Sequence, residues 1–202
     1  MSRRCLPVLV TGLLLVVLLG ATDELKVAED WKSPGVSTRQ FGNILVVAIT
    51  DQQEARHRFE DKFVSHLRSQ GVQGMTSHSL VADLQVIEDR DKVIDTLLQD
   101  EVDGVISIRL IPLDGRDEEE WSAAWRTQAG SEETLRELIR STLPVKETNA
   151  RRYGVEVALW SIEARSRVWA GRTVGYKVKH LKKGAGSFVQ NVMWALKDAN
   201  RF

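Results

Sequence analysis

Two kinds of apolar pattern follow each other in the first half of the chain. Residues 43–50 form a continuous apolar run rich in β-branched side chains, which is typical of a strand covered on both faces. The next apolar side chains recur every fourth residue: Ala55, Phe59, Phe63 and Leu67. This spacing predicts an amphipathic helix that ends at Gly71. A short strand over residues 72–75 would complete a β-α-β unit.

Strands and helices continue to alternate in the second half. Residues 89–98 predict another helix, and residues 105–111 predict a second mostly apolar strand. Two further strands, 155–162 and 168–176, flank five residues, a length that fits a β-hairpin. A last helix is predicted to begin at Ser187.

These patterns predict one α/β domain over residues 42–202. We expect a mixed, partly parallel sheet with flanking helices, a C-terminal β-hairpin and a final helix, with right-handed crossovers between the parallel strands. Leu159 and Trp160 should point to opposite faces of their strand, with one of the two half exposed. The residues expected to be buried together are Ile44, Val46, Phe59, Phe63, Leu67, Val105, Ile106, Ile108, Leu159, Val192 and Leu196.

The start of the chain predicts export. Arg3 and Arg4 precede an uncharged run of about 16 residues, whereas a membrane-spanning helix needs roughly 20. We therefore interpret residues 1–21 as a signal peptide and residues 22–41 as a polar tether. The run ends as a bacterial lipoprotein signal does, but Ala21 stands where the lipidated cysteine would be. Cleavage into a soluble form is favoured, while a retained anchor or lipidation from a different start stays open.

Composition narrows the possible functions. Without residues 1–21 the chain has 181 residues, which suits one domain, and 26 basic against 28 acidic side chains, a net charge of −2. This balance argues against a nucleic-acid partner, which normally needs a concentrated basic surface. The single cysteine, Cys5, lies in the signal peptide, so the remainder offers no disulfide, thiol nucleophile or thiolate metal site.

No residue pattern indicates an enzyme, a metal site or a cofactor. His57 and His66 are nine residues apart on one predicted helix and therefore face opposite sides. No serine has the sequence context of a catalytic triad. Glu118 and Glu119 lie in a charged run and are expected to point into water, and Asp51 and Asp103 fit a helix cap and a turn better than a hydrolytic pair.

Two segments are candidate binding sites. Between a predicted strand and a predicted helix lie Lys182, Lys183, Gly184, Gly186 and Ser187. Free N–H groups at a helix start, beside two lysines, would suit an anion. The alternative is a flexible turn in which the serine caps the helix.

Tryptophans form the second candidate. Trp121 and Trp125 lie one helical turn apart, so they share a helix face. That face either packs on the sheet or forms a surface for a partner, because tryptophan is favoured at interaction hot spots.

The order of elements resembles a family of small bacterial envelope domains. The resemblance is carried by the strand motif at 44–47, the helix motif Phe59-Glu60-Asp61, the segment 102–106, and the paired segments 159–162 and 168–171. Similar patterns occur in uncharacterised lipoproteins, and the architecture looks like the amino-terminal domain of TolB and related envelope lipoproteins. Over roughly residues 42–200, the resemblance implies a mostly parallel sheet used for protein contacts in the envelope.

The sequence thus favours a non-enzymatic, periplasmic or secreted interaction module of the cell envelope. Its expected partner is another envelope protein, with membrane contact only through a retained N-terminal segment. A binding protein for a small anionic or glycan ligand is the second hypothesis, and a hydrolytic enzyme is the third.

Overall fold

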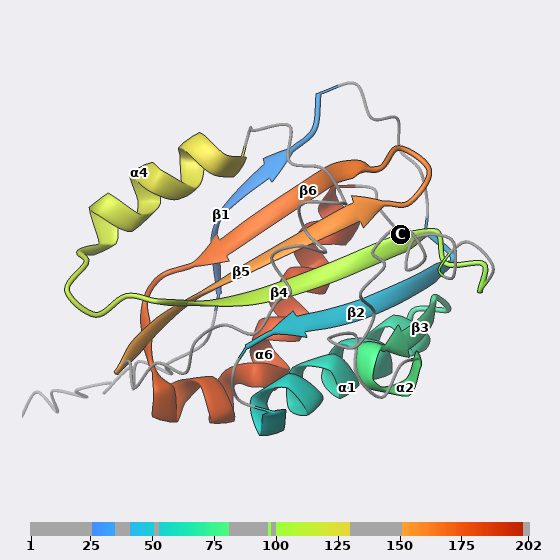
Figure 1. Cartoon of the computed structure of the whole chain (residues 1–202), viewed down its shortest axis with the longest axis horizontal. Helices are drawn as coiled ribbons and strands as arrows, with labels where there is room; N and C mark the ends of the chain where they lie inside the picture. The colour runs from blue at the N-terminus through green and yellow to red at the C-terminus, as the bar shows by residue number, and fades with distance from the viewer. Residues whose placement is uncertain are drawn as a thin grey trace, which may run out of the picture.

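A computed structural model describes residues 26–34, 41–50, 53–80, 97, 100–129 and 151–199. The described strands form one sheet of seven strands in the order β1-β6-β5-β4-β2-β3, with β7 paired to β5 (Figure 1). The strands are β1 (Val27–Lys32), β2 (Asn43–Ile49), β3 (Gln73–Thr76), β4 (Gly104–Pro112), β5 (Arg152–Ser161), β6 (Ser166–Thr173) and β7 (Tyr176–Lys177). The helices are α1 (Gln53–Ser69), α2 (Ser77–Leu80), α4 (Glu118–Ala129) and α6 (Val178–Asp198).

The sheet is mixed, as the sequence predicts, but the mostly parallel sheet implied by the family resemblance is wrong, because two of the six described strand pairings are parallel and four are antiparallel. β2 pairs in parallel with β3 and with β4, while β4, β5, β6 and β1 pair successively in antiparallel fashion. The β5–β6 hairpin and the final helix are confirmed. The predicted helix over residues 89–98 falls almost entirely outside the described residues, as does the whole of the signal peptide.

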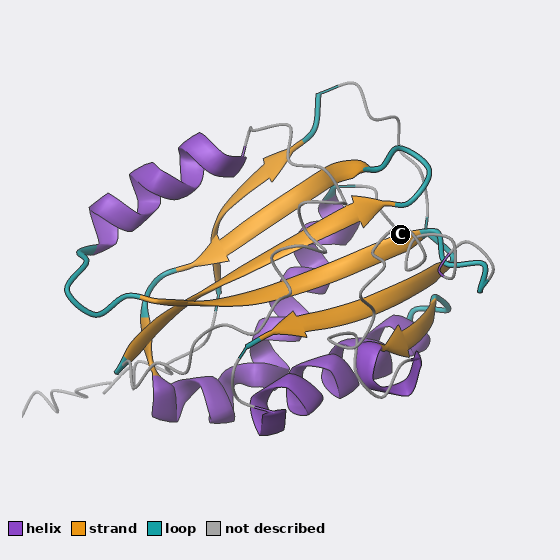
Figure 2. Cartoon of the chain, in the orientation of Figure 1, coloured by secondary structure: helices purple, strands orange, loops and turns teal. Residues whose placement is uncertain are grey.

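Helices lie on both sides of this sheet: α1 and α6 on one face and α4 on the other (Figure 2). Ile44, Val46 and Ala48 of β2 belong to the core beneath α1 and α6, whereas Leu45 and Val47 belong to the core beneath α4. Because successive strand residues point to opposite faces, a strand covered on both sides must be apolar throughout. This explains the continuous apolar run of residues 43–50.

All the expected core residues are buried, but they do not form one cluster. Val105 lies on the α4 side of the sheet, while the other ten lie on the side of α1 and α6. Leu159 and Trp160 do point to opposite faces, yet both are buried. The expectation that one of them is half exposed is wrong, because α4 covers part of the face that carries Trp160. The indole Nε1 of Trp160 donates a hydrogen bond to Ser107 Oγ at 2.9 Å.

Part of the expected tether belongs to the sheet. Residues 27–32 form β1, which pairs with β6 along the edge of the sheet. A register shift between Val27 and Glu29 turns Glu29 toward the α4 side, where it meets Ser122 and Arg126. This polar segment is therefore an edge strand and not a free linker. One of its inward-facing side chains, Glu29, is charged.

Candidate functional site

The first cluster of polar side chains lies where the parallel strands β2 and β3 end, a common place for ligands in α/β sheets. At its centre is Glu60 of α1, whose side chain is fully buried. The carboxylate accepts hydrogen bonds from Ala48 N (2.9 Å), Ser77 N (3.0 Å) and Ser77 Oγ (2.7 Å). Arg56 Nε donates at 3.3 Å, and His78 Nδ1 lies 3.0 Å away. The chain's own donors therefore surround Glu60.

This arrangement has a structural role. A buried carboxylate is stable only when its oxygens are hydrogen-bonded or paired with a cation, and here the donors come from β2, α1 and the corner between β3 and α2. Glu60 joins these elements and leaves little acceptor capacity for a substrate. We find no geometry here for general acid or base catalysis by this carboxylate.

Two histidines lie beside Glu60. The rings of His57 and His78 have centroids 4.5 Å apart, and His78 Nε2 is 3.6 Å from Asp61 Oδ1. Within the described parts of the chain, no three histidine, cysteine or acidic side chains are grouped in a way that could hold a metal ion. His66 lies elsewhere on α1, at the surface hollow described below.

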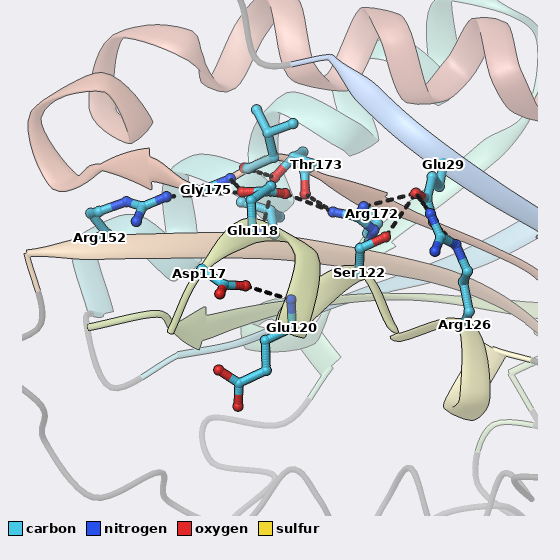
Figure 3. A network of polar contacts seen from close by, with 12 residues as sticks. Glu29, Asp117, Glu118, Glu120, Ser122, Arg126, Arg152, Arg172, Thr173 and Gly175 are labelled. Carbon is cyan, nitrogen blue, oxygen red and sulfur yellow. Dashed lines mark hydrogen bonds and ion pairs between the residues drawn. The ribbon is translucent and has the colours of Figure 1, made fainter. Parts of the chain in front are cut away.

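The second polar cluster centres on Arg172 of β6 (Figure 3). The Arg172 residue is 4% exposed. Its guanidinium donates to Glu29 Oε1 and to Glu118 Oε1, each at 2.9 Å, and lies 4.8 Å from the centroid of the Trp121 ring. Glu118 Oε2 also accepts from the backbone N–H of Gly175 at 2.9 Å. The prediction that Glu118 points only into water is therefore wrong.

Glu29 is held in its ionised form by this network. The hydrogen bond from Arg172 lowers the pKa of Glu29 from 4.5 to about 2, against the opposing effect of burial, and hydrogen bonds from Arg126 and Ser122 add to the lowering. These contacts connect β1, β6 and α4. We interpret the cluster as a set of hydrogen bonds and ion pairs that stabilises the packing of the edge strand β1 and of α4 on the sheet.

Trp121 and Trp125 pack inward, as one of the two sequence interpretations has it. They are 3% and 5% exposed, and the Trp121 ring lies where a side chain at Gly154 of β5 would be. The interpretation of these tryptophans as a partner surface is therefore wrong. The absence of a side chain at residue 154 allows the indole to approach the backbone of the sheet.

The expected anion nest is not formed, because α6 begins at Val178 instead of Ser187. Gly184, Gly186 and Ser187 lie inside the helix, where backbone N–H groups are used by the helix itself, and Ser187 Oγ donates to Gly184 O at 3.0 Å. Lys182 and Lys183 also belong to α6, but the structure describes only their backbone and not their side chains. Burial of the apolar stripe, Ala185 included, offsets the low helix propensity of the two glycines.

The remaining feature is a surface hollow between α1 and α6, with a volume of about 250 Å³. Its lining residues are His66, Ser69, Gln70, Gln190, Met193, Trp194 and Lys197. Trp194 is 65% exposed, although its neighbour Met193 is buried. At about 100° per residue, Trp194 falls roughly opposite Val192 and Leu196. An aromatic residue out of phase with the apolar stripe was thus a signal that the sequence analysis missed.

Comparisons with known proteins give distant structural likenesses. No family model matches the chain, and no curated protein matches it in sequence. The PelC dodecamer from Paraburkholderia phytofirmans is 12% identical with a TM-score of 0.44, covering 86% of this chain and 96% of that one. Lipoprotein GNA1162 from Neisseria meningitidis is 10% identical with a TM-score of 0.40, covering 78% of this chain and 99% of that one. The resemblance to TolB stays a prediction.

Proposed function

We propose that the chain is an exported, non-enzymatic protein-interaction module of the cell envelope, and that the hollow beside Trp194 is its contact surface. Export is supported by the basic and apolar start of the chain. Among the described residues, no helix is both long and apolar enough to cross a membrane.

The exposure of Trp194 is the observation that carries this proposal. A large side chain that is 65% exposed leaves apolar surface in water, and tryptophan beside a small hollow is typical of the centre of a protein interface. The two buried polar clusters support the same view, because Glu60 and Arg172 are engaged by the protein itself.

A binding site for a small anionic or glycan ligand is the second candidate. It is favoured by the polar lining of the hollow, where Ser69, Gln70 and Gln190 could hydrogen-bond hydroxyl or anionic groups.

Affinity capture with matched variants tests the proposed function. The exported chain and its Trp194→Ala variant would be used to capture proteins from envelope extracts, with Val174→Ala as the control. Val174 is also an exposed apolar residue, at 39%, and does not line the hollow. We expect a partner that binds the native chain and the control but is lost from Trp194→Ala. Equal binding by all three would refute the contact surface.

A further inference from the structure

Two parallel rows of side chains border the hollow. Lys62 and His66 of α1 and Gln70, the residue that follows this helix, are spaced by four residues. On α6, Gln190, Trp194 and Lys197 are spaced by four and then three residues and share one face of the helix. We call this surface, made of these six residues, the Trp194 groove. Five of the six line the hollow, and Lys62 extends the α1 row by one turn.

The charged side chains of the Trp194 groove are both lysines, so the groove carries positive charge. Lys62 and Lys197 form no ion pair with a described residue, and no carboxylate lines the hollow. The neighbouring acids face other groups: Asp61 lies 3.6 Å from the ring of His78, and Asp198 lies 3.6 Å from Lys32 Nζ. The groove thus offers the ammonium group of Lys197 at the hollow that holds the exposed indole, and that of Lys62 one helical turn beyond the lining residues of α1.

This distribution argues against two other occupants. A second copy packed through the same face would place each lysine near a basic surface of its own kind, which is unfavourable in a symmetric contact. A membrane surface would need a broad exposed apolar face, and the described residues offer Trp194 alone as a large exposed apolar side chain in this groove.

We propose that the Trp194 groove binds an acidic segment of another envelope protein, which places one large apolar side chain in the hollow and carboxylates beside Lys62 and Lys197. This inference rests on the proposed function and adds the chemistry of the partner. The apolar side chain covers the indole of Trp194, and the amides of Gln70 and Gln190 lie where they can hydrogen-bond the backbone of the segment. The lysines attract the segment and set its direction in the groove.

Site-specific cross-linking tests the chemistry. A photoreactive amino acid would replace Gln190 in the full chain, expressed in its own cells, and the cross-linked peptide would be mapped by mass spectrometry. Cross-linking would be compared between three forms that carry the probe: the otherwise native chain, a double variant with Lys62→Glu and Lys197→Glu, and a double variant with Lys62→Arg and Lys197→Arg. Arg116→Glu with Lys177→Glu is the control, because it changes the net charge equally at two exposed positions outside the groove.

We expect an adduct with a peptide of net negative charge that contains a large apolar residue. Its yield should fall about tenfold or more with the glutamate pair in the groove and should persist with the arginine pair and the control pair. An adduct with a neutral or basic peptide, or a yield insensitive to the glutamate pair, would refute the acidic partner while leaving the interaction surface in place.

Other adducts would remove the proposed function as well. Cross-linking only to lipid or to glycan would identify a different kind of ligand, and cross-linking only to a second copy would make the groove a self-association surface. No adduct at all, from Gln190 or from a second probe at Gln70, would show that the groove is not a contact surface.

Discussion

The negative charge of Glu29 should raise the free energy of unfolding of the protein at neutral pH, and this contribution should be lost at low pH. Replacing Glu29 by glutamine keeps the size of the side chain and an oxygen that can accept hydrogen bonds from Arg172 and Ser122, but removes the charge. The pKa of Glu29 is lowered in the folded protein, from 4.5 to about 2. A carboxyl group with a lowered pKa stabilises the fold above its unfolded pKa, and this contribution is lost as the pH falls toward the folded pKa.

The size of the effect follows from the shift. A lowering from 4.5 to about 2 corresponds to about 3.5 kcal/mol of stabilisation before screening, at roughly 1.4 kcal/mol for each pKa unit. The side chain of Glu29 is 25% exposed, so screening by water reduces the expected contribution to about 1–2 kcal/mol. Arg172 would also lose an ionised partner while remaining buried, which acts in the same direction.

Urea unfolding followed by tryptophan fluorescence measures this contribution. At neutral pH the native chain should be more stable than Glu29→Gln by about 1–2 kcal/mol, and the difference should shrink steadily as the pH falls from about 4.5 toward 2. Glu119→Gln is the control, because Glu119 is an exposed glutamate of α4; its effect should stay within about 0.5 kcal/mol. A Glu29 difference that is absent at neutral pH, or equal at neutral pH and at about pH 3, would refute the reasoning.

Four further changes test the fold and the processing of the chain. Phe63→Ala should lower the free energy of unfolding by about 3–5 kcal/mol, because this side chain is fully buried; denaturant unfolding measures it, and a loss below about 1 kcal/mol would contradict its place in the core. Gly154→Ala should lower stability by about 1–3 kcal/mol or more, because the added methyl group would overlap the ring of Trp121. Gly186→Ala should instead raise thermal stability, by up to about 1 kcal/mol, since the position is helical and has open space; destabilisation would contradict a helix there. Ala21→Cys should move the exported protein to membranes with an added acyl mass, whereas the native chain should show none by intact-mass measurement.

Local patterns were sufficient for the elements whose burial is periodic. The run at 43–50 and the four-residue spacing that includes Phe63 correctly predicted β2 and α1, because each residue's environment there repeats with the geometry of the backbone. The hairpin followed from two apolar runs with a short link. The start of α6 was placed too late, since Gly184 and Gly186 suggested a turn although the apolar stripe continues through Ala185.

The candidate site was harder to predict than the helices and strands, because the exposure of a side chain depends on which elements pack against it. The sequence directed attention to Trp121 and Trp125, which are buried, and missed Trp194, which is exposed. Trp194 differs from the others in its helical phase, since it falls opposite Val192 and Leu196, but the shared phase of Trp121 and Trp125 does not by itself show whether their face of α4 is buried. Their exposure depends on what packs against each helix: α4 presses its tryptophans onto the sheet, whereas α1 and α6 meet in a way that leaves a hollow beside Trp194.

The sequence by itself determined the class of the fold and the alternation of strands and helices, because these depend on residues close together in the chain. Only the tertiary structure decided the partners of the charged residues. Glu29 and Arg172 are 143 positions apart, and nothing local to either shows that the two will meet across β1 and β6. Electrostatic contacts between distant segments form only once the backbone has brought them together, so the roles of Glu29, Glu60 and Arg172 come from the fold.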